Sequence, residues 1–293
     1  MNTPKSNPFI GIFLLILSMM FFQGGAGFAT FLMKETGPYG ATALRQVFSL
    51  VSMIFIARMW KIDFSKINLK KFLAYGISLG LMNLTFYIAI ERIPLGVAVA
   101  IEFSGPLFVS LISSRKPLDF VWVLLACVGL YFLMPISQFG AHLDKFGVLC
   151  AVLAAIGWAG YIIAGHRLGK DYDGLTAVAL GIFVSSLFTV PIGIVNAGAV
   201  LFEPKILLFG LALGLLTNAI PYSIEMMALK QLSRQSFSLL MSLEPAFAAL
   251  AGAIILSQNL GLIQIVAIAL IIFATIGSTL SHKDKPVVEE LQS

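Results

Sequence analysis

Apolar stretches of about 20 residues, separated by short polar loops, run through the whole sequence. A helix needs about that length to cross the ~30 Å hydrocarbon core of a bilayer. Only 11% of the 293 residues are charged and the mean hydropathy is +0.96, whereas about a quarter of the residues of a soluble protein are charged. The sequence therefore predicts an all-α membrane protein and excludes a water-soluble fold.

Ten spans are expected along the chain. They cover residues 9–33, 38–58, 70–90, 94–114, 118–136, 146–166, 174–197, 205–228, 235–256 and 261–281. The first is a retained span rather than a signal peptide, because it is longer than a signal-peptide core and no cleavage site follows it. The loops are too short to contain a soluble domain, so function is expected inside the membrane.

The 19 basic residues alternate between the loops in a pattern that sets the topology. If the N-terminus is cytoplasmic, only Lys34, Arg92, Lys145 and Lys205 lie in outer loops, and Arg45 alone lies within a span. Basic residues gather in cytoplasmic loops. The bias predicts that both termini, including a tail at 282–293, are cytoplasmic, and it favours an even number of spans.

The fourth and ninth expected spans carry a similar short motif. Residues 96–102 (GVAVAIE) match residues 238–244 (SLLMSLE), and a proline follows each glutamate, Pro106 in one span and Pro245 in the other. Two halves of five helices each, at 1–140 and 141–281, must enter the membrane from opposite sides because five is odd. The sequence thus predicts two inverted five-helix repeats, a common plan of secondary transporters.

Glu102 and Glu244 are the leading functional candidates. Each lies eight or nine residues into its span, so both are ~12 to 14 Å deep, entering from opposite faces. A carboxylate at that depth is costly and generally faces a cavity or a partner. The two readings are a role in binding substrate or a coupling proton, and a purely structural pairing.

Arg45 lies at nearly the depth of Glu102, and two interpretations stay open for it. It forms a salt bridge that neutralises Glu102, or its guanidinium binds a substrate carboxylate through two parallel hydrogen bonds.

Further polar groups lie within the expected spans. Glu225 is a site candidate, with the alternative that it reaches toward the cytoplasmic interface near Lys230. The others are candidates for substrate contact or for ordinary helix-to-helix hydrogen bonds and packing. They are Gln23, Asn83, Tyr87, Trp158 and Tyr161.

Other classes of function find no support in the sequence. His142, His166 and His282 lie at loops or span edges and form no metal-binding helix motif, and no nucleophile elbow is present. The basic residues form no aromatic-studded patch of the kind that binds nucleic acid. We therefore expect no enzyme activity, no catalytic residue, no cofactor and no metal.

Several motifs resemble the amino-acid exporters of the EamA-like branch of the drug/metabolite transporter superfamily. They include residues 75–80 (YGISLG), 94–100 (PLGVAVA), 105–107 (GPL), 221–223 (PYS) and 244–246 (EPA), and the resemblance extends over nearly the whole chain. It implies ten helices in two inverted repeats, the bacterial inner membrane, and efflux of amino acids with L-threonine and L-homoserine as leading substrates. It also adds Tyr222 to the residues expected around the central cavity.

The hypothesis that follows is an alternating-access antiporter in which Glu102 and Glu244 organise the amino-acid ammonium or a coupling proton. Its partners are a small amino acid, protons and membrane lipids, and the sequence leaves both a monomer and a homodimer open. A broad-specificity drug or metabolite exporter is the alternative within the same class. A non-transporting membrane scaffold or receptor is the alternative outside it.

Overall fold

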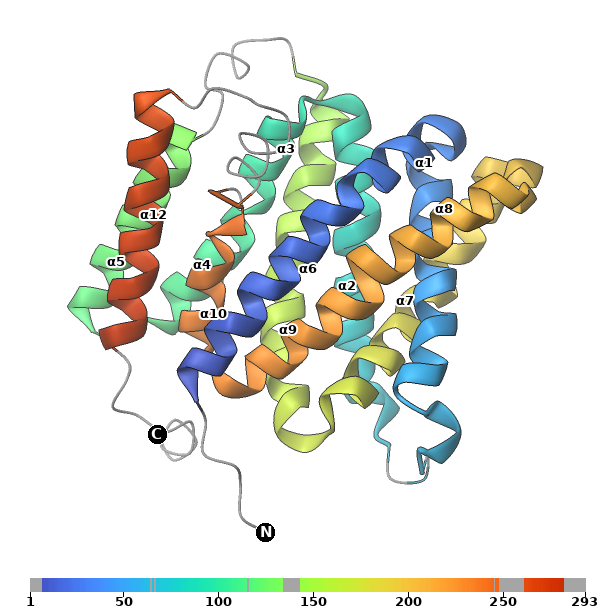
Figure 1. Ribbon diagram of the computed structural model, residues 1–293, viewed down its shortest axis with the longest axis horizontal. Coiled ribbons are helices and arrows are strands. Elements are labelled where there is room, and N and C mark those ends of the chain that lie inside the picture. The colour runs from blue at the N-terminus through green and yellow to red at the C-terminus, as the bar shows by residue number, and fades with distance from the viewer. Residues whose placement is uncertain are drawn as a thin grey trace.

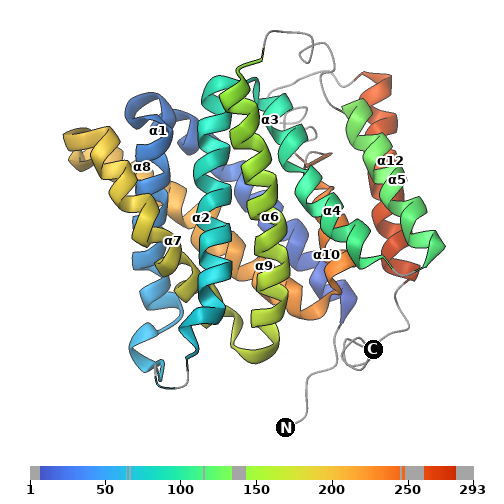
Figure 2. The same cartoon turned by 180° about the vertical axis from the view of Figure 1, so that it is seen from behind.

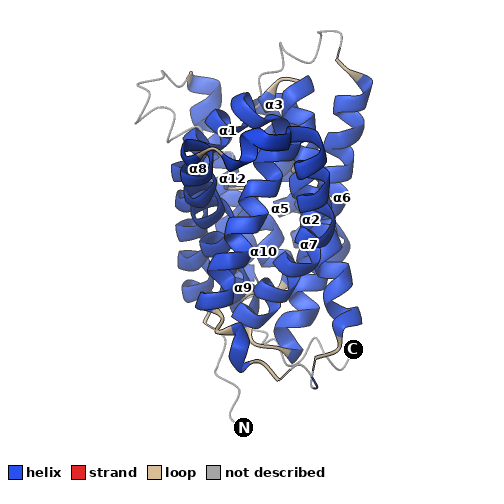
Figure 3. Cartoon of the chain, turned by 90° about the vertical axis from the view of Figure 1, so that its right-hand side faces the viewer, coloured by secondary structure: helices blue, strands red, loops and turns tan. Residues whose placement is uncertain are grey.

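The computed structural model describes residues 7–63, 65, 67–114, 116–133, 143–244, 246–247 and 261–281. Within these residues every regular element is helical and none is a strand, as Figure 3 shows. The large apolar side chains that remain exposed, such as Phe13, Leu124 and Val195, lie on the outer faces of the bundle. This confirms the prediction of an all-α membrane protein.

The described residues form a series of helices. They are α1 (Pro8–Ile56), α2 (Leu69–Arg92), α3 (Leu95–Glu102), α4 (Ser104–Ser113), α5 (Pro117–Leu133), α6 (Lys145–Asp171), α7 (Gly174–Ala197), α8 (Pro204–Gly214), α9 (Ile220–Gln231), α10 (Arg234–Met241) and α12 (Leu262–Ser281). The described elements also include the 3-10 turns η1 (Met59–Lys61) and η4 (Gly198–Phe202) and the π-helical turn η5 (Leu215–Ala219).

Among the described residues, five helical segments are long and apolar enough to cross a membrane. They are Phe31–Ile56, Leu69–Arg92, Lys145–Asp171, Gly174–Phe202 and Pro204–Gln231. Shorter apolar helical segments are Pro8–Phe22, Val97–Ser113, Pro117–Phe132 and Leu262–Ser278. Parts of the expected spans 118–136 and 235–256, and the tail 282–293, lie outside the described residues.

Helices α2 and α6 are antiparallel and lie side by side on the face of the bundle that is at the front in Figure 2 and at the back in Figure 1. At one end Lys71 Nζ lies 2.5 Å from Asp171 Oδ2, and at the other Arg92 Nη1 lies 3.1 Å from Asp144 Oδ2. Asp144 also caps α6 by accepting from the backbone N–H of Phe146, and this hydrogen bond, with the nearby Arg92, lowers the pKa of its carboxyl. An ion pair therefore holds the two helices together at each end.

Helix α1 is interrupted where two expected spans meet. Gly37 has φ 66° and ψ −179°, a backbone conformation that residues with a Cβ atom rarely adopt, and Pro38 follows it. The chain therefore changes direction at Gly37, and Figure 1 shows the two parts of α1 as separate helical rods that meet at a bend.

We expect Gly37→Ala to destabilise the protein by about 1 to 3 kcal/mol, because alanine is strained at this φ and ψ. Gly24→Ala is the matched control, since a Cβ would meet nothing within 4 Å at either glycine and only Gly37 has a positive φ. Thermal unfolding in detergent measures both variants. Equal unfolding temperatures for the two would contradict the assigned backbone strain.

Candidate functional site

A cavity of about 240 Å³ lies among helices from both halves of the chain. Eight of the residues proposed from sequence line it: Arg45, Asn83, Tyr87, Glu102, Trp158, Tyr222, Glu225 and Glu244. The remaining wall is largely apolar and includes Phe22, Met33, Met82, Phe86 and Met241. Apolar walls around a few convergent polar groups are typical of small-molecule sites.

Glu102 is the last residue of α3, where the helix is broken. Pro106 has no backbone N–H, so the carbonyl of Glu102, four residues earlier, loses its helical donor, and the chain turns at Phe103 before α4 begins. A Cβ on Gly105 would lie 2.2 Å from the carbonyl oxygen of Ala155, so only glycine lets α4 approach α6 here. The break and this close approach place the Glu102 side chain at the cavity.

Glu244 occupies the corresponding position after α10. Its helix ends at Met241, a turn follows at Ser242 and Leu243, and Glu244 then reaches the cavity. Pro245 itself lies outside the described residues. Glu102 is 8% exposed and Glu244 is half-buried, and neither forms a hydrogen bond or ion pair with any residue that the structure describes. One buried and one half-buried carboxylate thus face one cavity without a protein partner in that part of the chain.

Arg45 interacts with the opposite wall of the cavity. Its Nη2 donates to the carbonyl oxygen of Thr217 and to the Tyr222 hydroxyl, the latter at 3.4 Å. The guanidinium carbon lies 5.8 Å from the ring centres of both Tyr87 and Tyr222, a cation–π arrangement. Because no ion pair joins Arg45 to Glu102, the salt-bridge interpretation of these two residues is wrong.

Thr217 is a cavity residue that the sequence reasoning missed. It lies in the π-helical turn η5, and Pro221, four residues later, has no N–H to donate to its carbonyl. The unsatisfied carbonyl accepts from Arg45 instead. Pro221 was therefore the signal in the sequence, since a proline inside a span releases the carbonyl one turn before it.

Glu225 is 1% exposed and lines the cavity, so the alternative that it reaches toward the interface is wrong. Its Oε2 accepts from the Tyr161 hydroxyl at 2.8 Å, and its Oε1 lies 3.5 Å from the Ser18 hydroxyl. Tyr161 does not line the cavity, but it stacks on Tyr75 with ring centres 5.3 Å apart. Glu225 is thus the carboxylate of this site that has protein donors.

Tyr222 connects three elements around the cavity. Its hydroxyl donates to Asn83 Oδ1 at 3.1 Å while it accepts from Arg45, and Asn83 Nδ2 donates to the Leu79 carbonyl. Trp158 packs edge-on against Phe103, with ring centres 4.7 Å apart, directly beside the break after Glu102. The polar groups of α1, α2 and α9 are therefore coupled through one hydroxyl.

The remaining sequence predictions have plainer outcomes. The side chain of Gln23 lies outside the described residues, as do His142 and His282. His166 is buried in α6 and does not line the cavity. In the described part of the chain, no three histidine, cysteine or acidic side chains gather in a metal-binding arrangement.

We expect Tyr222→Phe to lower the stability by about 1 kcal/mol, because it removes the hydroxyl shared by Arg45 and Asn83 without changing the ring. Tyr131→Phe makes the same chemical change on α5, where the side chain is 58% exposed, and should leave stability unaltered. Unfolding temperatures in one detergent compare the two. A Tyr222→Phe protein as stable as Tyr131→Phe would disprove the coupling.

Comparison with known proteins extends these observations. The chain is 43% identical over 290 residues to "Threonine/homoserine exporter RhtA" of Salmonella typhimurium strain SL1344, covering 99% of this chain and 98% of that protein. It is also 43% identical over 287 residues to the Escherichia coli K12 protein of the same description, covering 98% and 97%. An "Uncharacterized transporter" of Archaeoglobus fulgidus is 24% identical over 251 residues, 81% of this chain and 86% of the relative.

Residues 145–280 match the model of the EamA-like transporter family. One solved crystal structure shares the fold, with a TM-score of 0.77 at 17% identity, over 97% of this chain and 99% of that one. Apolar spanning helices that enclose buried charged side chains define a multi-pass membrane transporter, not an enzyme. The chain belongs to the EamA-like transporter family, as its full-length likeness to the bacterial exporters shows. It is accordingly a protein of the inner membrane.

Proposed function

We propose that this protein exports small amino acids, above all L-threonine and L-homoserine, across the inner membrane by proton-coupled alternating access. The observation that carries the substrate assignment is 43% identity, over nearly the full length of both chains, to exporters described by those two amino acids. The cavity adds a chemical argument, because it combines a buried cation with buried carboxylates.

A zwitterionic amino acid suits this arrangement of charges. A guanidinium has five N–H donors, and both hydrogen bonds of Arg45 to described residues leave from Nη2. Donors therefore remain for a substrate carboxylate. Glu102 and Glu244 have acceptor oxygens that no described residue occupies, which suits a substrate ammonium. Thr217, Asn83 and Tyr222 lie at the same cavity and are candidates to bind a substrate hydroxyl.

The proton coupling follows from the cost of a buried charge. A carboxylate held in a membrane interior without a partner is expensive, so a cation or a proton must neutralise it. A substrate ammonium and a proton would compete for Glu102 and Glu244. Release of substrate outside would then favour proton uptake there, and proton release inside would free the site for the next substrate.

The architecture proposed for this cycle is ten spans in two inverted halves, 1–140 and 141–281, each an EamA-like repeat. It is supported by the likeness of α3 to α10. Both are eight-residue helices that end at a break. Glu102 is the last residue of α3, and Glu244 lies three positions after the last residue of α10. Both carboxylates line the cavity. Both termini and the tail at 282–293 are assigned to the cytoplasm from the bias of basic loops.

The orientation can be tested with single cysteines in a chain whose Cys127 and Cys150 are replaced by alanine. In intact cells, a membrane-impermeant maleimide should label Lys205→Cys, at the start of α8, and not Lys230→Cys, at the end of α9. Permeabilised cells supply the control, because both positions should then react. Labelling of Lys230→Cys alone in intact cells would reverse the topology.

The transport role can be tested with labelled L-threonine and inverted membrane vesicles. Glu102→Gln keeps the side-chain shape but removes the charge and the titratable proton, so we expect at least a tenfold lower uptake and no stimulation by a proton gradient. Glu203→Gln is the control, since Glu203 is exposed and its side chain does not cap α8. Glu102→Gln vesicles that respond to the gradient as wild type does would remove Glu102 from the coupling.

The same assay separates the alternatives. Equal counterflow with many unrelated metabolites would indicate a broad-specificity exporter. Absence of counterflow for all amino acids and metabolites, from protein shown to be folded, would indicate a scaffold or receptor.

A further inference from the structure

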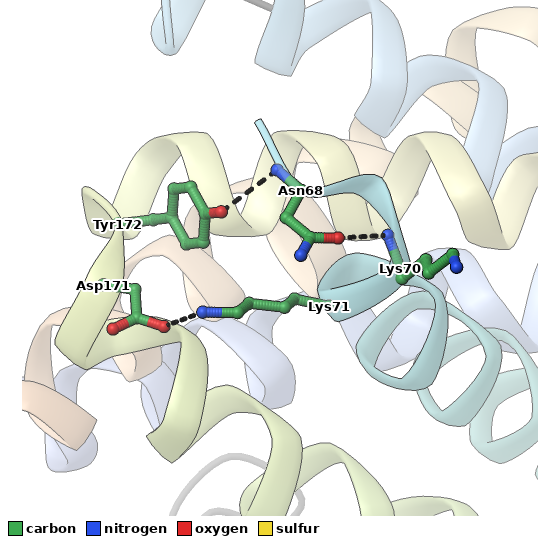
Figure 4. A network of polar contacts seen from close by, with 5 residues as sticks. All are labelled: Asn68, Lys70, Lys71, Asp171 and Tyr172. Atoms are coloured by element: carbon green, nitrogen blue, oxygen red, sulfur yellow. Dashed lines mark hydrogen bonds and ion pairs between the residues drawn. The ribbon is translucent and has the colours of Figure 1, made fainter. Parts of the chain in front are cut away.

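A second cleft, of about 640 Å³, opens between α2 and α6 at the end where α2 begins and α6 finishes. It is separate from the central cavity, because the two share no lining residue. Nothing in the proposed transport cycle uses it. Figure 4 shows its polar rim, where Lys71 reaches toward Asp171 and Tyr172 covers the start of α2.

Four cations and one carboxylate line this rim: Lys70 and Lys71 on α2, and Arg167, Lys170 and Asp171 on α6. Asp171 pairs with Lys71, and both side chains are about half exposed. Lys70, Arg167 and Lys170 form no ion pair with any residue that the structure describes. The rim therefore has an excess of positive charge at the ends of two helices that are long and apolar enough to cross a membrane.

Below the rim the cleft becomes apolar. Ala74 and Ser78 follow Lys70 at successive turns of α2, and Gly160 and Ala164 precede Arg167 on the facing side of α6. Ser78 lies about 12 Å along α2 from Lys70, at 1.5 Å per residue. These short side chains leave an apolar groove that descends from the cations toward the membrane interior.

The surface around the cleft is lipid-facing. Leu73 and Ile77 on α2 and Ile156 on α6 are 41%, 50% and 58% exposed, so apolar side chains flank the groove on both helices. The two helices carry the central-site residues Asn83, Tyr87 and Trp158 at other positions, where they line the other cavity. The cleft is thus open to the bilayer, and not to the substrate cavity.

We propose that this cleft binds one anionic phospholipid from the leaflet at the end of the bundle where α1 begins. Its phosphate lies among Lys70, Arg167 and Lys170, and its glycerol and first acyl carbons occupy the groove over Ala74 and Ala164. Cations at the mouth and an apolar floor together fit a lipid with a charged headgroup. A guanidinium suits phosphate oxygens particularly well, because its N–H groups match their spacing.

The rim is already ordered for this ligand. The backbone N–H of Asn68 donates to the Tyr172 hydroxyl at 3.1 Å, and Asn68 Oδ1 accepts from the backbone N–H of Lys70 at 3.2 Å. The Lys71 ammonium lies 5.9 Å from the centre of the Tyr172 ring. These contacts fix the first turn of α2 against the end of α6, so the two helix ends that carry the cations are positioned before lipid binds.

Native mass spectrometry of the purified, delipidated full-length protein tests the proposal, with dioleoyl phosphatidylglycerol and dioleoyl phosphatidylcholine as probes. The wild type should retain one phosphatidylglycerol at least tenfold more tightly than phosphatidylcholine. The triple variant Lys70→Gln, Arg167→Gln, Lys170→Gln should lose this preference. The triple variant Lys34→Gln, Lys145→Gln, Lys205→Gln removes the same charge away from the cleft and should bind within twofold of wild type. Equal losses of phosphatidylglycerol binding in the two triple variants would overturn the proposed site.

A second pair of variants tests the groove with every charge in place. Ala74→Phe fills the floor and should weaken phosphatidylglycerol binding at least tenfold, whereas Leu73→Phe, on the neighbouring exposed position, should not. Unchanged binding to Ala74→Phe would overturn the proposal. Competition by sn-glycerol 3-phosphate at concentrations similar to those of the lipid would also overturn the proposal, since the ligand would then be a soluble phosphate ester.

Discussion

The burial of Arg45 is the constraint on which the centre of this protein depends. A guanidinium in a membrane interior must be surrounded by groups that replace its water shell. Here they come from three elements: the carbonyl of Thr217 in η5, the faces of Tyr87 and Tyr222, and the Tyr222 hydroxyl that also donates to Asn83. Satisfying one charge thus brings α1, α2 and α9 to a common wall of the cavity, which Glu102, Glu225 and Glu244 also line.

The sequence predicted much of this site because depth and charge are readable from it. Glu102, Glu244 and Arg45 were placed at similar depths, and all three line one cavity. Their partners were not predictable in the same way, because depth says nothing about how far each helix is rotated about its axis. Arg45 consequently bonds with η5 rather than with Glu102, and Glu225, one turn or so from Lys230, points inward to Tyr161 and not to the interface.

Prolines lie next to the points where the helices are interrupted, and each interruption contributes to the fold or to the cavity. Pro38 follows the change of direction at Gly37, Pro106 follows the break at Phe103, and Pro221 follows the π-helical turn. In the last two cases the residue whose carbonyl is released, four positions before the proline, lines the cavity: Glu102 in one and Thr217 in the other. Kinks could be expected from sequence, but which released carbonyl receives a donor could not, since the donor comes from another helix.

The neighbours of each helix bear on how such a molecule can move. α2 is joined to α6 at both ends by ion pairs, α4 lies against α10, and α5 lies against α12 (Figures 1 and 2). In every one of these pairs one helix comes from residues 1–140 and the other from residues 141–281. A motion that separated the first half of the chain from the second would break all three of these helix–helix contacts together. For the alternating access proposed above, the moving bodies would therefore be assembled from helices of both halves of the sequence.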